Sequence, residues 1–132
     1  MKVICVCNTL DALSDGQALR LKDDIHISQL HLTIGAEYVV FGVSFREDTV
    51  WYLICEDNGD KYPVPHCAWF FKLCDSSIPS DWQLSLNLAS NAGPIAILPR
   101  EWADDNSFLE KLVDGAPEAI HQFEMMKGRQ QA

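Results

Sequence analysis

Short apolar runs, separated by polar and turn residues, dominate the first hundred positions of the chain. Most of them are rich in β-branched and aromatic side chains, which favour strands over helices. Their lengths are also those of strands rather than helices. The pattern therefore predicts antiparallel strands at residues 2–7, 37–43, 50–55, 69–73, 83–88 and 94–98.

Turn residues between these runs predict how the strands connect. Asn58-Gly59 favours a hairpin because both residues tolerate positive φ. Arg46-Glu47-Asp48 predicts a charged turn before residue 50. Pro63 and Pro65 cannot donate hydrogen bonds to a sheet, so we expect an edge strand or a bulge there.

Alternation within two of the runs predicts which side chains are buried. Leu84, Leu86 and Leu88 alternate with polar residues, which is typical of a half-buried strand with the leucines facing inward. In residues 50–55 both faces are apolar, so one face is expected in the interior and the other under the C-terminal helices or a partner.

Two regions lack the strand pattern. Residues 9–29 are polar, with the turn signal Ser14-Asp15-Gly16, and are predicted to form a long exposed loop. The last third changes to a helical period. One helix is predicted over 107–113, capped by Asp105 or Asn106, with Gly115 as its stop, and a second begins at Pro117. The expected apolar faces of these helices consist of Phe108, Leu109, Leu112 and Val113, and of Ala119, Ile120, Phe123 and Met126.

These elements predict one α+β domain that is mainly β. Its 132 residues are too few for two independent cores. Short antiparallel strands at regular spacing favour a small barrel over 1–98, including the exposed loop at 9–29. A helical extension over 99–127 and a frayed tail at 128–132 are expected to follow.

The net charge of −9 limits the possible partners. Nucleic acids and anionic membranes attract lysine and arginine, so neither is expected to bind. The first apolar run is too short for a signal peptide, and no run reaches the roughly 20 residues of a membrane helix, so a soluble, cytoplasmic protein is expected. Acidity is spread along the chain, and it suits either solubility or attraction to a basic protein.

Five cysteines cannot all pair within one chain, and each lies among apolar neighbours. Reduced and mostly buried thiols are therefore expected. A zinc site formed by Cys5, Cys7, His66 and Cys67 is the alternative, although Cys-x-Cys spacing fits tetrahedral zinc poorly. We expect neither a metal nor a cofactor.

One set of short motifs lies between about residues 30 and 76. Its members are Leu32-Thr33-Ile34-Gly35, Glu37-Tyr38-Val39-Val40, Tyr52-Leu53-Ile54, Asp57-Asn58-Gly59, Tyr62-Pro63-Val64, Phe71 and Asp75. This set resembles the pattern of small bacterial SH3-like barrel proteins, which is a Leu-Thr-x-Gly-Lys-x-Tyr-x-Val segment, a strand ending in Asp-x-Gly, a Tyr-Pro step and a closing Phe. Ala36 departs from it where a lysine is common. The resemblance implies a five- or six-stranded barrel, and some such proteins are immunity proteins that neutralise a toxin.

Catalytic patterns are sparse in this sequence. It has no phosphate-binding glycine loop and no Gly-x-Ser-x-Gly motif, and the adjacent His66-Cys67 pair points apart on an extended chain. The carboxylate pairs Asp23-Asp24, Glu47-Asp48 and Asp104-Asp105 are the candidates for acid–base work, but solvated faces and helix caps explain such pairs as well. The prediction is therefore a protein that is not an enzyme.

The sequence thus predicts an acidic protein-binding domain, with an immunity-type inhibitor of a basic toxin as its model. The alternatives are a small-molecule-binding or enzymatic barrel with a site between barrel and helices, and a homo-oligomeric structural protein. Exposed tryptophans are frequent interface anchors, and four tryptophans are available. The candidate partner-binding residues are Asp23, Asp24, Glu47, Asp48, Tyr52, Asp57, Asp60, Tyr62 and Trp69.

Overall fold

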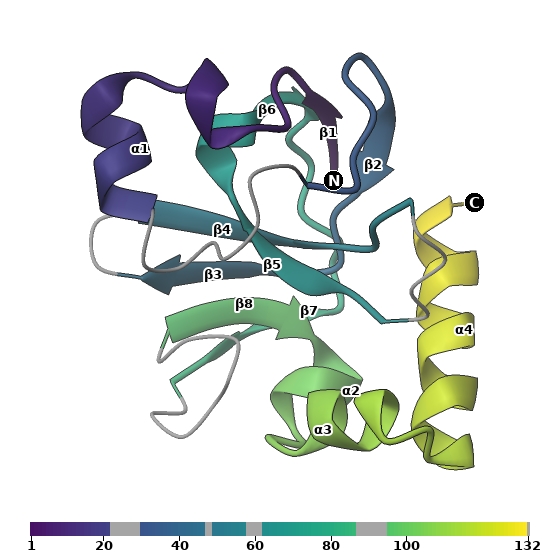
Figure 1. The fold of residues 1–132 in the computed structure, drawn as a ribbon. Coiled ribbons are helices and arrows are strands. Elements are labelled where there is room, and N and C mark those ends of the chain that lie inside the picture. The colour runs from purple at the N-terminus through teal and green to yellow at the C-terminus, as the bar shows by residue number, and fades with distance from the viewer. Residues whose placement is uncertain (22–29, 47–48, 58–61, 87–94, 132) are drawn as a thin grey trace.

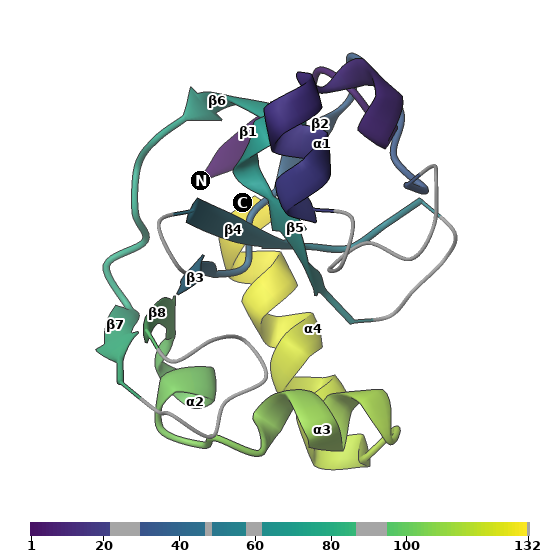
Figure 2. The same cartoon turned by 60° about the vertical axis from the view of Figure 1, so that its left-hand side comes forward.

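The computed structural model describes residues 1–21, 30–46, 49–57, 62–86 and 95–131. Its strands form two antiparallel sheets (Figures 1 and 2). The three-stranded sheet has the order β2 (Glu37–Val39), β1 (Lys2–Cys5), β6 (Phe71–Asp75). The five-stranded sheet has the order β5 (Val64–Cys67), β4 (Thr49–Ile54), β3 (Val43–Arg46), β8 (Ile95–Pro99), β7 (Trp82–Ser85).

Helical segments lie at both ends of the chain. Figure 1 shows α1 beside the three-stranded sheet, α2 and α3 below the five-stranded sheet, and α4 along the right-hand side. The helical elements are η1 (Leu10–Ala12), α1 (Asp15–Leu21), η2 (Ala68–Phe70), α2 (Arg100–Ala103), α3 (Phe108–Val113) and α4 (Pro117–Gln131).

The α+β class is confirmed, but the predicted closed barrel is wrong. The larger sheet is open, with β5 and β7 at its two edges within the described residues. The reason lies in the apolar run 37–43, which does not form one strand. Val40 donates its N–H to the Met1 carbonyl in one sheet, whereas Phe41 donates to Leu53 in the other. The chain therefore changes sheets here, and the strands are shared between two layers.

Two hydrophobic cores hold the layers together. The first lies between the two sheets and includes Val3, Tyr38, Ile54, Phe71 and Trp82. The second packs the opposite side of the larger sheet against α2, α3 and α4, with Phe41 and Phe123 edge to face at 5.1 Å between ring centroids. Trp51, Leu53 and Ile54 of β4 are therefore buried in these cores, whereas Val50 and Tyr52 are half-buried.

The predicted loop at 9–29 is wrong where α1 forms. Ser14 and Gln17 cap this helix reciprocally: Gln17 N–H donates to Ser14 Oγ, and Ser14 N–H donates to Gln17 Oε1, both at 3.3 Å. Leu21 at the end of α1 is buried in the first core. Residues 22–29 lie outside the described residues.

The alternation of leucines in residues 83–88 predicts burial that the structure does not show for Leu84 and Leu86. Leu84 is 63% exposed and Leu86 is 67% exposed, whereas Trp82 is buried. Leu88 lies outside the described residues. Trp82 and Leu84 lie on the same side of this edge strand, and only the tryptophan end is covered. Alternation therefore identifies the apolar side of β7 but not whether another layer covers it.

At the C-terminus, both predicted helices form. Gly115 ends α3 with a φ of +80°, and its N–H donates to the Leu112 carbonyl. Of the predicted apolar faces, Val113 and Ile120 are exposed and the remaining residues are buried or half-buried. The prediction of a frayed tail from residue 128 is wrong, because α4 continues to Gln131.

The edge-strand prediction is confirmed, since Val64–Cys67 forms β5 at one edge of the larger sheet. The hairpin between β4 and β5 also forms, with Ile54 opposite Val64. Its turn, Asn58-Gly59, lies outside the described residues, as do Glu47 and Asp48 between β3 and β4. Cys5, Cys7 and Cys67 are buried, Cys55 is half-buried and Cys74 is exposed.

Candidate functional site

An apolar pocket of about 220 Å³ opens between the larger sheet and the connection from β6 to β7. Figure 2 shows this connection running down the outside of the molecule, past β4, β3 and β8. None of the described residues that line the pocket carries a charged side chain. The pocket is lined by Met1, Val43, Phe45, Val50, Tyr52, Leu73, Ile78, Trp82 and Ile97.

Strand register explains how these side chains come together. Val43 on β3 lies opposite Tyr52 on β4 and opposite Ile97 on β8. Phe45, two residues further along β3, lies opposite Val50 and Ile95 in the same way. Because residues two apart and residues directly opposite share a face, the two rows form one continuous apolar surface.

Exposed aliphatic side chains surround this pocket. Leu73 and Ile78 belong to its lining, Leu84 lies opposite Ile97, and Ile95 lies opposite Phe45. These four residues and Leu86 make up five of the eleven large hydrophobic side chains that are exposed among the described residues. We call Leu73, Ile78, Leu84, Leu86 and Ile95 the aliphatic rim. Contiguous exposed apolar surface of this kind is typical of interaction sites.

A second, polar pocket of about 520 Å³ adjoins the first and shares Met1 and Ile78 with it. It also contains Asp75, Asp81 and Arg129. The Asp75 Oδ1 accepts hydrogen bonds from Ser77 N–H at 3.0 Å and Ser77 Oγ at 2.6 Å. These bonds lower the pKa of Asp75, so its carboxylate stays ionised at neutral pH.

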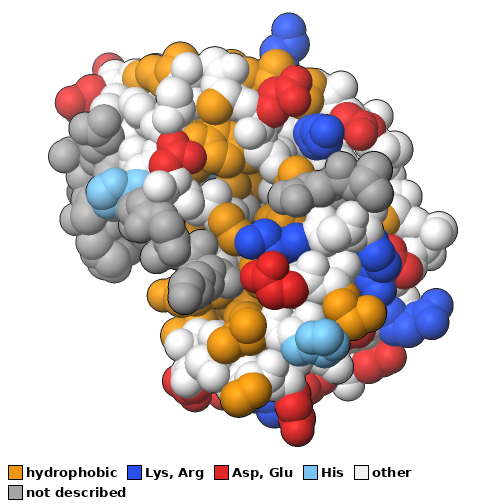
Figure 3. Space-filling model, turned by 90° about the vertical axis from the view of Figure 1, so that its right-hand side faces the viewer, with side chains coloured by type: hydrophobic (Ala, Val, Ile, Leu, Met, Phe, Trp, Pro, Cys, Tyr) orange, Lys and Arg blue, Asp and Glu red, His pale blue; other side chains and the backbone are white. Residues whose placement is uncertain are grey.

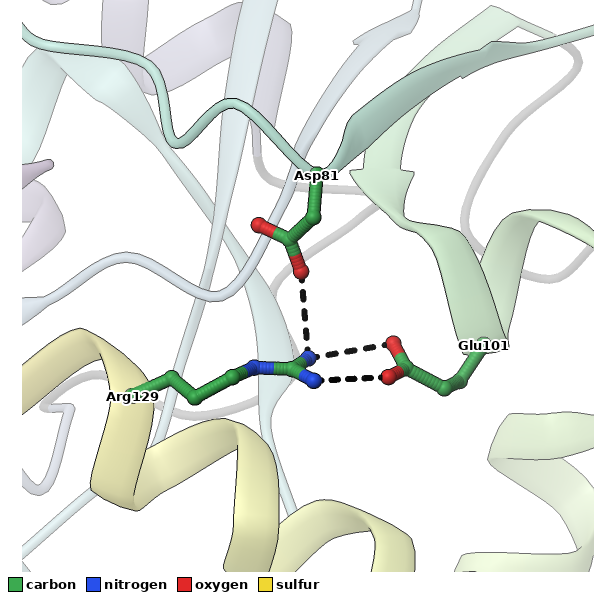
Figure 4. Close-up of polar contacts among 3 residues, drawn as sticks. All are labelled: Asp81, Glu101 and Arg129. Carbon is green, nitrogen blue, oxygen red and sulfur yellow. Dashed lines mark hydrogen bonds and ion pairs between the residues drawn. The ribbon is translucent and has the colours of Figure 1, made fainter.

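Arg129 on α4 is held by two carboxylates (Figure 4). Its guanidinium donates to both oxygens of Glu101 on α2, at 2.9 and 3.2 Å, and to Asp81 before β7 at 3.1 Å. The hydrogen bonds from Arg129 lower the pKa of Glu101 and raise that of Arg129. The positive charge of Arg129 is therefore offset within the protein, so this arginine is a poor receptor for an anion.

The apolar pocket contains a single hydroxyl group, that of Tyr52. Burial raises the pKa of Tyr52, which keeps its phenol neutral at physiological pH. No carboxylate, imidazole or thiol lines the pocket within the described residues. The described lining side chains can therefore hold an apolar group by burial, and apart from the neutral Tyr52 phenol none of them is an acid, base or nucleophile.

Charges of both signs are interspersed on the side that carries α4 (Figure 3). Hydrophobic side chains form the floor of a hollow there, and Lys, Arg, Asp and Glu side chains lie around it. The net negative charge is therefore not gathered into one acidic patch on this face.

The structure brings few of the predicted partner-binding residues together. Tyr52 lines the apolar pocket, whereas Trp69 packs against the first core and Tyr62 against the second. The Asp57 carboxylate accepts hydrogen bonds from Tyr38 Oη and from Thr33 Oγ1, so it ties loop 31–33 to β2. Five other candidates lie outside the described residues, namely Asp23, Asp24, Glu47, Asp48 and Asp60.

Sequence reasoning missed the aliphatic rim altogether. Leu73 and Ile95 fall in predicted strands, Ile78 falls in a turn region, and Leu84 and Leu86 were expected to be buried. These side chains are exposed because no other layer of the described residues covers this end of the larger sheet, and the sequence pattern does not show that. The tryptophans do not mark the exposed surface either, since Trp51, Trp82 and Trp102 are all buried.

The histidine and cysteine residues of the zinc alternative do not form a metal-binding group. Among the described residues, no cluster of three or more His, Cys, Asp or Glu side chains is arranged to hold a metal ion. Cys5 Sγ instead donates to the Cys7 carbonyl oxygen at 3.3 Å. Burial raises the pKa of both thiols, which makes them unreactive at neutral pH.

Comparisons with protein-family models, with curated proteins and with solved structures gave no match. The resemblance to SH3-like barrel proteins therefore stays a prediction. Within the part of the chain that the structure describes, no helix combines the length and the apolar character needed to cross a bilayer.

Proposed function

We propose that this chain is a non-catalytic protein-binding domain that recognises a basic protein. An immunity-type inhibitor, which neutralises a basic toxin inside the cell, is the model for this role. The observation that carries the proposal is the aliphatic rim around an uncharged pocket, on a chain with a net charge of −9.

Two kinds of physical argument support it. Exposed leucine and isoleucine side chains gain free energy when a partner covers them, at roughly 25 cal/mol per Å² of apolar surface. The negative charge of the chain speeds encounters with a positive partner and disfavours acidic ones. The apolar surface thus supplies affinity, and the charge supplies selectivity.

The nature of the described pockets also favours binding over catalysis. Enzymes need an acid, base, nucleophile or metal in reach of the substrate. The apolar pocket offers the neutral Tyr52 hydroxyl, and the polar pocket offers Asp75 and Asp81 beside an arginine that is already engaged. These groups suit recognition of a surface.

Co-purification of the tagged full chain from its native host tests this proposal. At about 50 mM salt we expect one stoichiometric partner with a basic isoelectric point, and weaker retention at about 500 mM salt because exposed charges are screened. Retention of no protein at low salt would contradict the proposal. So would a partner that is acidic and insensitive to salt.

A further inference from the structure

We infer that the apolar pocket is an anchor site that takes one aliphatic or aromatic side chain of a basic protein partner. This inference rests on the proposed function and names how that function is carried out. The aliphatic rim then packs against the partner residues that flank the anchor.

The size of the pocket indicates a side chain rather than a free ligand. Its volume is about 220 Å³. An apolar cavity of about 150 Å³ accepts benzene, whereas sites for drug-sized molecules and cofactors span about 300–1,000 Å³. The pocket is therefore in the size range of one large apolar side chain, such as that of leucine, phenylalanine or tryptophan.

The chemistry of the lining selects an apolar group. Val43, Phe45, Val50 and Ile97 form one side of the pocket on the larger sheet. Leu73 on β6 and Ile78 on the β6–β7 connection also line it. A charged or strongly polar group would lose its hydration here without gaining partners. Sugars, nucleotides and free amino acids are disfavoured for this reason.

The surroundings have the anatomy of a protein interface. A central pocket for an anchor, enclosed by side chains that exclude water, is the usual arrangement of a binding hot spot. The rim residues are between 44% and 67% exposed, so each has apolar surface left to bury. A free small molecule would leave this rim in contact with water.

The charge of the chain indicates which kind of protein can bind at the anchor site. Two copies of the chain would each carry a net charge of −9, which opposes self-association. In addition, Asp75 lies in the polar pocket that adjoins the anchor site, where Arg129 already binds Asp81. A partner segment with an apolar anchor, and with a lysine or arginine that reaches Asp75, complements both pockets.

A first experiment tests the pocket without the partner. Toluene and acetamide, analogues of the phenylalanine and asparagine side chains, are titrated into the isotope-labelled full chain, and chemical shifts are followed by NMR. We expect toluene to move the signals of Val43, Tyr52, Ile97 and the Trp82 indole, and acetamide to leave them unchanged. No response to toluene, or equal responses to both compounds, would overturn the anchor site.

A second experiment tests whether the partner uses the pocket. Ile78→Asp places a charge at the pocket, and Ile34→Asp is the matched control, since these isoleucines are 55% and 59% exposed and Ile34 lines neither pocket. For the basic protein that the chain retains, we expect Ile78→Asp to raise the Kd at least tenfold and Ile34→Asp less than twofold. Circular dichroism confirms that both variants fold.

The outcomes separate this inference from the proposed function. Equal affinities of the two variants for a retained basic partner would overturn the anchor site and leave the proposed function standing. A response to toluene without any basic partner would contradict the proposed function and the partner class. A dimer of the chain that dissociates in Ile78→Asp would assign the pocket to a second copy, which also overturns the inference.

Discussion

Single residues in this protein have structural roles that the sequence pattern does not predict. Gly42 lies where β3 passes between β4 and β8, and a Cβ atom there would lie 2.7 Å from both Leu53 Cδ1 and Leu98 Cδ2. The two leucines fill the space that a side chain would need. A side chain at this position would therefore have to displace the ends of two buried leucines in the second core.

Gly42→Val is expected to destabilise the fold by about 1–3 kcal/mol, because the added methyl groups overpack a closed core. Urea unfolding measures the change. Gly128→Ala in α4 is the control, since its Cβ meets open space and alanine favours the helix, so stability should hold or rise. Equal effects of the two substitutions would contradict the packing argument.

His66 shows how burial decides the behaviour of a titratable group. The side chain lies in β5 against Phe71, with Nε2 3.3 Å from Glu56 Oε1, and it is 4% exposed. Although Glu56 would favour the charged imidazole, burial outweighs it and lowers the pKa of His66 to about 4 from its ordinary 6.5. His66 is therefore neutral in the folded protein at neutral pH.

Because the unfolded chain binds the His66 proton more readily than the folded protein, stability should fall as the pH drops from about 6.5 towards 4. The loss is at most about 3 kcal/mol. Urea unfolding at several pH values measures it. His66→Gln should flatten this pH dependence, whereas His121→Gln, at an exposed position, should not. A parallel slope in His66→Gln would refute the assignment.

At the level of elements, the sequence predicted where strands and helices form better than it predicted which of their faces are covered. Strand-favouring composition located β1, β4 and β8, and Pro63 and Pro65 indicated the edge strand β5. Gly115 located the end of α3, and Pro117 located the start of α4. Two failures have local causes. The Ser14-Gln17 capping box was present in the sequence but was overlooked among polar residues. The break at Val40–Gly42 depends on pairing with distant strands, which no local pattern encodes.

The C-terminal end of α4 joins layers that are far apart in sequence. Arg129 binds Glu101 and Asp81, and the next residue contacts both sheets. With its amide oriented to satisfy both neighbours, Gln130 donates to the Val40 carbonyl at 2.8 Å and accepts from Trp82 Nε1 at 3.3 Å. A run of polar residues at 128–132 predicts fraying, but these long-range contacts hold the last turn in place.

Arg129→Met should therefore reduce stability at pH 7 by up to about 1 kcal/mol, the usual limit for an exposed ion pair. Because Arg129 lowers the pKa of Glu101, its contribution is full above the ordinary value of 4.5 and is lost as the pH falls below it. Urea unfolding at pH 7 and pH 3 measures both effects. Lys127→Met, which removes a 3.8 Å contact to Glu124 and a contact of the ammonium group with the Phe123 ring, should have a similar small effect at both pH values. A loss of stability that is as large at pH 3 as at pH 7 would contradict the ion-pair explanation.

At the scale of the whole molecule, the two sheets leave one end of an apolar face uncovered. The sequence predicted an acidic, mixed α+β domain, and it predicted that its function lies in an exposed surface. It could not place that surface, because the apolar pocket joins residues from Met1 to Ile97 through strand pairing and through the packing of the two sheets. Most of the partner contacts predicted from the sequence are acidic residues, whereas the exposed surface around the apolar pocket is aliphatic.

The charge of the molecule predicts its state of association. Despite the exposed aliphatic rim, sedimentation velocity at about 50 mM salt should show a monomer, because each copy carries a net charge of −9. Raising the salt to about 500 mM screens this repulsion and should favour any weak self-association. A tight dimer at low salt would show that the rim serves a second copy instead of a basic partner.

The most direct test of the account is to map the bound partner on the labelled chain by NMR. With the basic protein retained from the host, we predict that the largest chemical-shift changes fall on Leu73, Ile78, Leu84 and Ile95, around the apolar pocket. Changes confined to α1, α3 or α4, with these four residues unaffected, would contradict it.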